Sequence, residues 1–185
     1  MMKEEIVYDG YLKIKATEGV NKNGTSIKRE VMSRTRSGND YSVAGTLYDT
    51  EKNVFYLVSQ YRAGAATEDE RYITEVVAGT MEEGEEPKEC FTREAMEEVG
   101  FDVKQIVGAG SYYTSPGGTS EKIFLFHATG IKTEIGGGLA EENEDIEIIE
   151  LTFDEIVSML QKREINDIKT RLLLIEVYMS ITNNK

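Results

Sequence analysis

Three glutamates stand close together in REAMEEVG, residues 93–100, and their spacing is suited to holding a cation. On a helix that turns about 100° per residue, Glu94, Glu97 and Glu98 fall within an arc of roughly 100° and share one face. Like charges at this spacing destabilise an isolated helix by about a few tenths of a kcal/mol per pair, so a bound divalent cation would offset the repulsion. The alternative is a solvated acidic face, which is the usual position of surface glutamates.

The helix that presents these glutamates is expected to run from Pro87 to about Val99. Proline is favoured at the first position of a helix, and Gly100 is a typical residue just beyond a helix end. The side adjoining the acidic face carries Phe91, Ala95, Met96 and Val99. This pattern predicts a helix with one face in the core and the other bearing carboxylates.

The overall charge points to the same need for a cation. The chain has 34 acidic and 21 basic residues, for a formal net charge of −13, which argues against nucleic acid as a partner. An anionic substrate would therefore require divalent cations that invert the local sign. With one cysteine, Cys90, and one histidine, His127, the usual four-ligand nitrogen and sulfur zinc cage is excluded. A metal would be held by oxygen ligands.

The residues before and after the glutamates form a spaced motif that is more specific for a function than the glutamates alone. Gly79 is followed after five residues by Glu85, and after seven more by the stretch Arg93 to Phe101. This arrangement resembles the Nudix box, G-x5-E-x7-R-E-U-x-E-E-x-G-U, with every fixed identity filled. Ala95 is small for the first apolar position U, a departure that concerns packing and not chemistry. The resemblance implies hydrolysis of a diphosphate with Mg²⁺, or Mn²⁺ in its place, held by carboxylates and substrate oxygens.

The box also implies roles for its residues. Glu94 and Glu98, one turn apart, are expected to share metal ions, and Glu97 to act as an outer or water-mediated ligand. Arg93 is expected to pair with Glu85 and tie the loop to the helix. Family resemblance adds the backbone carbonyl of Ala78 as a ligand and gives Gly79 and Gly100 structural roles.

Segments outside the box suggest the substrate. SPGGTSE (115–121) and GLAEENEDI (138–146) resemble the ADP-ribose pyrophosphatase branch, in which a proline lies about sixteen residues beyond the box, as Pro116 does here. The ending INDIKTRLLLIEVY instead resembles the GDP-mannose hydrolase branch. We expect ADP-ribose to be hydrolysed to AMP and ribose 5-phosphate, with GDP-mannose or another nucleotide sugar as the alternative. A non-catalytic nucleotide-binding regulator stays open, and a nucleic-acid-directed enzyme is disfavoured by the charge.

Further site residues are carried over from the family. Glu142 matches a proposed base or water-positioning group, and Glu144 a further metal ligand, on an acidic loop that three glycines could hinge as a lid. Arg62 matches a substrate-contacting arginine, although a surface arginine at a strand end is the alternative. Arg29 is a weaker candidate, because its match depends on a strand register inferred from the sequence pattern. In the family, N-terminal strands cross over and contribute to the partner's site, which implies a homodimer.

The expected fold is an α/β/α Nudix sandwich with a mixed sheet (residues 41–185), preceded by a strand-rich N-terminal dimerisation element (residues 1–40). Strands are expected over 6–31 as a meander, 43–49 and 54–62 as a hairpin, then 72–78, 103–112, 122–129 and 144–151. Thr152 with Glu155 predicts a capping box for a helix over 153–162, and 171–181 reads as a last amphipathic helix.

The remaining features concern localisation and two single residues, His127 and Cys90, that we do not expect to be catalytic. No run of about 18 apolar residues and no signal peptide is visible, so a cytoplasmic protein without a membrane span is expected. His127 shares a strand face with Ile123 and Leu125, which favours a packed histidine over a catalytic one. Cys90 could border the site, but is better read as a small packed residue.

Overall fold

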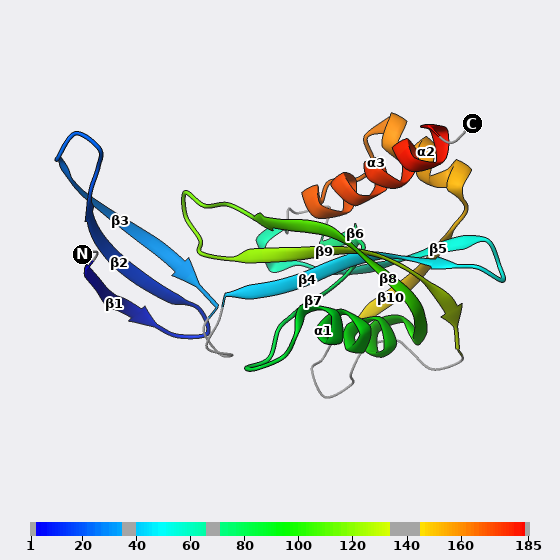
Figure 1. Ribbon diagram of the computed structural model, residues 1–185, viewed down its shortest axis with the longest axis horizontal. Coiled ribbons are helices and arrows are strands. Elements are labelled where there is room, and N and C mark those ends of the chain that lie inside the picture. Colours follow the sequence, from blue (N-terminus) through cyan, green and yellow to red (C-terminus); the bar gives the residue numbers. More distant parts are fainter. Residues whose placement is uncertain (1–2, 35–39, 66–70, 134–144, 184–185) are drawn as a thin grey trace.

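The computed structural model describes residues 3–34, 40–65, 71–133 and 145–183, and these form two β-sheets and several helices. Figure 1 shows the smaller, N-terminal sheet extending from one end of a larger sheet that lies between two helical layers. The strands are β1 (Lys3–Asp9), β2 (Lys13–Val20), β3 (Ser26–Ser33), β4 (Tyr41–Asp49), β5 (Val54–Tyr61), β6 (Tyr72–Glu75), β7 (Val77–Thr80), β8 (Phe101–Tyr113), β9 (Lys122–Lys132) and β10 (Ile146–Leu151). The helical elements are η2 (Ala63–Ala65), α1 (Pro87–Glu94), the π-helical turn η3 (Ala95–Val99), α2 (Phe153–Lys162) and α3 (Ile168–Asn183).

The N-terminal sheet is the antiparallel meander β1-β2-β3 that the sequence predicts. Its second hairpin turns at Asn21, whose side-chain oxygen accepts hydrogen bonds from the backbone N–H groups of Asn23 and Thr25. Gly24 adopts a φ of 79° there, which suits a residue without Cβ. The sheet joins the rest of the chain where Met32 N–H donates to the Gly118 carbonyl at 2.8 Å and the Met32 carbonyl accepts from Ser120 N–H at 3.2 Å.

The larger sheet is mixed, with strand order β10-β5-β4-β9-β8; β6 pairs with β5 and β7 with β4. The β4–β9 pair is parallel and the other pairs are antiparallel. Alternation along β5 divides the core between two faces. Val54, Tyr56 and Val58 pack with residues of α1 and η3, whereas Phe55 and Leu57 pack with residues of α2 and α3. The predicted α/β/α sandwich with a mixed sheet is thereby confirmed.

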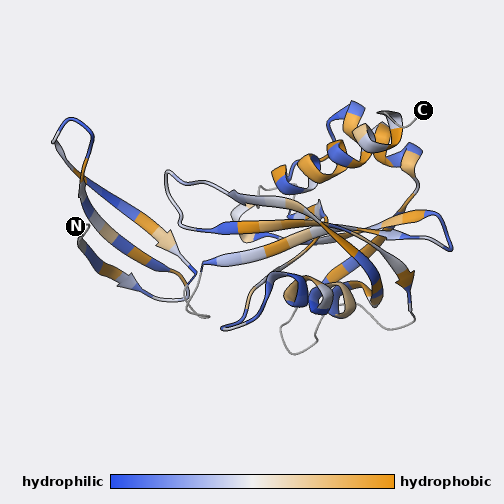
Figure 2. Cartoon of the chain, viewed as in Figure 1, coloured by the Kyte–Doolittle hydropathy of each residue, from blue (hydrophilic) through white to orange (hydrophobic). Residues whose placement is uncertain are grey.

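Hydropathy follows this layering. In Figure 2 the central strands of the larger sheet are mostly hydrophobic, whereas hydrophobic and hydrophilic residues alternate along the N-terminal strands. A strand covered on both faces needs apolar side chains on both, and a strand covered on one face or neither does not. In the part of the chain that the structure describes, no helix is long and apolar enough to cross a membrane.

Helix α1 begins at Pro87 as expected, but the run to Val99 is not uniform. Its last five residues form the π-helical turn η3, which ends at Gly100 with a left-handed φ of 70°. The expectation that Met96 faces the core is wrong, because this side chain is 36% exposed. A π turn changes the angular position of the residues within it, so the regular helical spacing no longer applies there.

The single strand expected over 72–78 is also wrong in detail, because it is divided into β6 and β7 at Val76. β6 pairs with β5, whereas β7 pairs with β4, so the chain changes partners at this point. The N–H of Val76 donates instead to the Thr170 hydroxyl on α3, at 2.9 Å. The division places Ala78 and Gly79 beside β4 rather than β5.

Both C-terminal helices begin with side-chain caps. Thr152 and Glu155 form the predicted capping box of α2. At the start of α3, the Asp167 carboxylate accepts hydrogen bonds from the backbone N–H and the hydroxyl of Thr170, at 2.8 and 2.6 Å. Such caps satisfy backbone donors that a helix start leaves without partners.

Candidate active site on the acidic helix

Arg93 gathers the carboxylates of the acidic helix. Its Nε and Nη2 donate to the two oxygens of Glu85 at 3.0 and 3.3 Å, which is the expected pair between loop and helix. Its Nη1 lies 2.9 Å from an oxygen of Glu97 and 2.9 Å from an oxygen of Glu94. The planar guanidinium fork can satisfy several carboxylates at once, which an ammonium group does less well. One arginine thus fixes three acidic side chains.

Hydrogen bonds between Arg93 and Glu85 stabilise the charged forms of both side chains. Burial alone would raise the pKa of Glu85, but hydrogen bonds from Arg93 and from the backbone of Glu82 outweigh it and lower the pKa. The hydrogen bond to Glu85 is the main cause of the raised pKa of Arg93. Burial raises the pKa of the adjoining Cys90, so its thiol stays protonated and unreactive. Cys90 is a packed residue, buried in the core beneath α1.

Gly79 gives Glu94 the space it occupies. A methyl group at position 79 would lie 2.0 Å from the carboxyl carbon and from Oε1 of Glu94, well inside contact distance. The strand β7 therefore approaches the helix so closely that a Cβ at position 79 would fit only if the Glu94 carboxylate moved away. Steric contact with Glu94 therefore explains why glycine stands at this position of the box. Ala78, whose carbonyl is a predicted ligand, is its neighbour on β7.

Glu98 is the most enclosed of the box glutamates, with only 3% of its surface exposed. The side chains of Glu94 and Glu97 are 14% and 30% exposed. A buried carboxylate is costly to ionise without a compensating charge or donors. The cluster offers carboxylate oxygens as ligands, and the space beside Gly79 admits one of them. Hard divalent cations prefer oxygen ligands of this kind.

The full ligand set predicted from the sequence is not assembled by the described residues. Among these, no group of three His, Cys, Asp or Glu side chains is arranged to hold a metal ion. Arg93 accounts for part of this, because it holds carboxylate oxygens of Glu94 and Glu97. Glu142 and Glu144, the predicted base and further ligand, lie outside the described residues.

Arg62 contacts Glu75 rather than a glutamate of the box. Its Nε donates to Glu75 at 2.7 Å, and Lys169 donates to the other oxygen of Glu75 at 2.5 Å. Glu75 is only 5% exposed, so it is a buried carboxylate paired with two cations. Lys169 in turn lies 3.0 Å from Asp167.

Sequence reasoning missed Glu75 and Lys169. The contact between them joins residues 94 positions apart, so no local sequence pattern predicts it. The D-x-x-T spacing of Asp167 and Thr170 would have indicated a helix start, and with it that Lys169 lies in the first turn of α3. The pair orients Arg62, which stays 40% exposed at its side chain.

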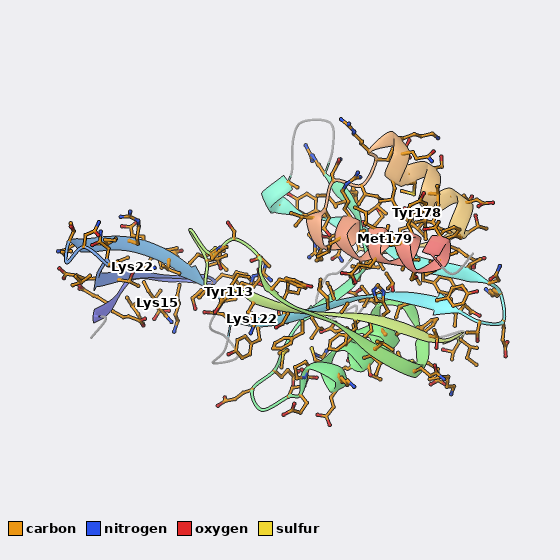
Figure 3. The ribbon with its side chains drawn as sticks, turned by 45° about the horizontal axis from the view of Figure 1, so that its top comes forward. Lys15, Lys22, Tyr113, Lys122, Tyr178 and Met179 are labelled. Carbon is orange, nitrogen blue, oxygen red and sulfur yellow. The ribbon has the colours of Figure 1, made fainter. Side chains whose placement is uncertain are left out.

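Arg29 lies on β3, in the sheet that extends away from the layer containing α1 (Figure 1). The structure therefore does not bring it to the box glutamates of its own chain. The SPGG segment forms an exposed turn between β8 and β9, against the end of β3. Tyr113 and Lys122, paired across the ends of these strands, mark the junction with the N-terminal sheet in Figure 3.

His127 lies on the face of β9 that is opposite α1, as its alternation with Phe126 and Ala128 requires. It contacts Thr46 and Glu176, at 2.8 and 3.1 Å. These contacts are on the other side of the sheet from Glu94 and Glu98. His127 therefore has no place in a site on the acidic helix.

Known proteins resemble this chain over most of its length. A family profile described as NUDIX domain matches residues 38–173. A curated GDP-mannose pyrophosphatase of Salmonella arizonae is 35% identical, over 97% of this chain and 95% of the relative. A protein of the same name from Escherichia coli is 33% identical, with the same coverage. A solved structure described as an ADP compounds hydrolase superimposes with a TM-score of 0.74 at 20% identity, covering 97% of this chain and 93% of the other, and shares the fold.

Proposed function

The chain belongs to the Nudix family, and we propose that it hydrolyses the diphosphate bond of a nucleoside diphosphate sugar, with GDP-mannose as the first candidate. The products would be GMP and mannose 1-phosphate. Two curated relatives that bear the name GDP-mannose pyrophosphatase support this choice, at 35% and 33% identity over nearly the whole chain. ADP-ribose, which the SPGGTSE and GLAEENEDI segments favour, is the second candidate. The intact box and these relatives support an enzyme rather than a non-catalytic regulator.

The observation that carries the proposal is the cluster in which Arg93 fixes Glu85, Glu94 and Glu97 beside the cradle of Gly79. Glu94, Glu98 and the Ala78 carbonyl, with Glu144, would hold Mg²⁺, with Mn²⁺ as a substitute. When bound, the ion neutralises diphosphate oxygens and lowers the pKa of an attacking water. Glu97 would act from the outer shell, where its bond to Arg93 orients it.

The remaining residues have binding and positioning roles in this proposal. Arg62 is partly exposed and its Nε is anchored by Glu75, so its two terminal nitrogens can bind a phosphate oxygen in a fixed orientation. Glu142 would accept the proton of the attacking water. Both roles follow family resemblance, and the anchoring of Arg62 supports the first.

We also propose that residues 1–40 mediate a homodimer in which Arg29 reaches the partner's site. Support comes from the N-terminal sheet, which exposes about half or more of the surface of Ile6, Val7, Tyr8 and Tyr11, at 52%, 52%, 59% and 73%. Burial of such residues against a second copy would be favourable at about 25 cal/mol per Å². The distance of β3 from α1 within one chain is consistent with a role in the other subunit.

The test of the activity is Mg²⁺-dependent release of phosphate, coupled to phosphatase, from GDP-mannose, ADP-ribose and other nucleotide sugars. Glu98→Gln should reduce turnover by about 100-fold or more, because it removes a charge from the proposed metal site. Glu89→Gln, an exposed glutamate on the same helix, is the matched control and should change turnover less than twofold. Equal turnover by the two variants would contradict the assignment, and preference for ADP-ribose would select the second substrate.

The test of the shared site is complementation. If Arg29 acts in the partner's site, Arg29→Ala and Glu98→Gln are each nearly inactive alone, but a mixed dimer of the two contains one intact site. Co-expressed mixed dimers should then recover up to about half of the wild-type turnover per dimer. Recovery that stays at the level of the separate variants would show that Arg29 acts within its own chain or has no role.

A further inference from the structure

A pocket of about 820 Å³ lies on the opposite side of the larger sheet from α1. Residues of strands β4, β5, β8 and β9 and of helices α2 and α3 line it. The alternation along β5 explains its separation from the proposed active site. Phe55 lines the pocket, whereas its neighbours Val54 and Tyr56 belong to the core beneath α1. Its volume falls within the range of about 300–1,000 Å³ that is typical of small-molecule sites.

A chain of polar contacts crosses this pocket. Thr46 Oγ1 lies 2.8 Å from His127 Nδ1, and His127 Nε2 lies 3.1 Å from Glu176 Oε2. Because an ionised carboxylate can only accept, Nε2 is the donor to Glu176, which leaves Nδ1 to make the contact with the Thr46 hydroxyl. The side chains of His127 and Glu176 are 29% and 35% exposed, so both are accessible from the pocket. A carboxylate has about four acceptor sites, so Glu176 can accept from His127 and from a ligand together.

The charge and shape of the lining favour one class of ligand. Glu176 is a carboxylate, and no lysine or arginine is among the described residues that line the pocket. The aromatic rings of Tyr48, Phe55 and Phe153 supply apolar surface and negative ring faces. Tyr48 and Phe55 are in contact, with ring centroids 4.8 Å apart, so they form one continuous apolar surface on the sheet side of the pocket. Anions would be repelled here, and an ammonium group would meet both a carboxylate and aromatic rings.

We propose that this pocket is a second ligand site, which binds a small organic ammonium ion with an aromatic or aliphatic body. The ammonium group donates to Glu176, which His127 and Thr46 hold in place, and the apolar body lies against Tyr48, Phe55 and Phe153. Tyr178 and Met179 mark α3 in Figure 3, and the same helix carries the lining residues Glu176, Val177 and Ser180. The site is independent of the diphosphate chemistry, from which the sheet separates it.

The competing explanation is that the His127–Glu176 contact only ties α3 to the sheet. This explanation predicts no saturable ligand and no preference among ligand charges. The two explanations can be separated directly, because His127 is the single histidine of the sequence and its ring gives one unambiguous NMR signal. That signal reports on the pocket without any need for substrate or metal.

The experiment titrates 2-phenylethylammonium into the full-length protein while the His127 ring signal and the ligand line widths are followed. Three matched probes are 2-phenylethanol, which lacks the charge, phenylacetate, which reverses it, and ethylammonium, which lacks the ring. The proposal predicts a saturable shift with 2-phenylethylammonium and at least tenfold weaker binding of each matched probe. No saturable shift, or equal binding of any one of the three matched probes, would overturn it.

Variants locate the binding. Glu176→Gln should weaken 2-phenylethylammonium at least tenfold, whereas Glu164→Gln should change it less than twofold. Glu164 is an exposed glutamate between α2 and α3 that does not line the pocket, so it controls for the loss of one negative charge. Phe153→Leu, which keeps the charge and removes a ring, should weaken binding several-fold and covers the case in which Glu176→Gln does not fold. Equal effects of the two glutamate variants would show general attraction to an acidic protein and would refute the site.

Discussion

Replacing Gly79 with alanine should disable the enzyme while leaving it folded. The added methyl group would lie 2.0 Å from the carboxyl carbon of Glu94, and an ordinary contact begins at 3.4 Å. The carboxylate must therefore move by roughly the difference, about 1.4 Å, or the strand must retreat by the same amount. The atoms that are met belong to the end of a side chain rather than to backbone, so the carboxylate is the part that yields.

A displacement of about 1 Å in a catalytic group is enough to reduce rate on the order of 100-fold. We expect kcat for the preferred nucleotide sugar to fall by this factor in Gly79→Ala, with a smaller change in KM. The free energy of unfolding should fall by about 1–3 kcal/mol, the usual cost of an added methyl group in a packed region, which leaves the protein folded. Steady-state kinetics and urea denaturation measure the two quantities separately.

Gly108→Ala is the control, since Gly108 also lies in a strand and an added methyl group there meets nothing within 4 Å. It should leave kcat within about twofold. The double variant that combines Gly79→Ala with Glu94→Ala should have the same kcat as Glu94→Ala alone, because the added methyl group acts through the Glu94 carboxylate. Full activity of Gly79→Ala, or additive losses in the double variant, would refute the steric reasoning.

Three further outcomes are expected. Arg93→Lys should lower the free energy of unfolding in urea by about 1–2 kcal/mol, because an ammonium group cannot replace the fork on Glu85; an unchanged urea midpoint would contradict this. Gly100→Ala should cost about 1–2 kcal/mol by thermal denaturation, because φ is 70° there; no loss would mean that the helix end rearranges. Burial would raise the pKa of Asp49, but hydrogen bonds from backbone N–H groups, first that of Lys132, outweigh it and lower the pKa. The Asp49 carboxylate therefore stabilises the fold fully above its ordinary pKa of 3.8, and this contribution is lost as pH falls below that value. In acid denaturation, the difference in free energy of unfolding between the wild type and Asp49→Asn should shrink as pH falls. A difference that is constant with pH would refute this.

Local patterns predict much of this molecule, because their causes are local. The box spacing, the proline at the start of α1 and the Thr152 capping box each depend on residues within a few positions of one another. Strand alternation likewise places His127 on the face of β9 that carries Ile123 and Leu125. These features predict the acidic helix and its neighbours, and the family resemblance carried by the box adds the sandwich.

The features that could not be predicted depend on distant partners or on departures from regular geometry. The π-helical turn moves Met96 out of the position that regular helical spacing assigns. The pairing of Glu75 with Lys169 joins residues 94 positions apart, and that of His127 with Glu176 spans 49. No sequence window contains both members of such a pair, so their charges read as ordinary surface groups until the fold brings them together.

The hydrogen bond from Val76 to Thr170 makes one backbone amide a reporter of helix docking. Val76 and Thr170 are both fully buried, and the amide is bonded to a side chain on α3 rather than to a neighbouring strand. Exchange of this amide with deuterated solvent therefore requires α3 to lift from the sheet, whereas amides within β4 and β9 require the sheet itself to open. Val76 lies just before the strand that carries Ala78 and Gly79, so its exchange rate would reveal how far movements of the C-terminal helix loosen the strand beneath Glu94.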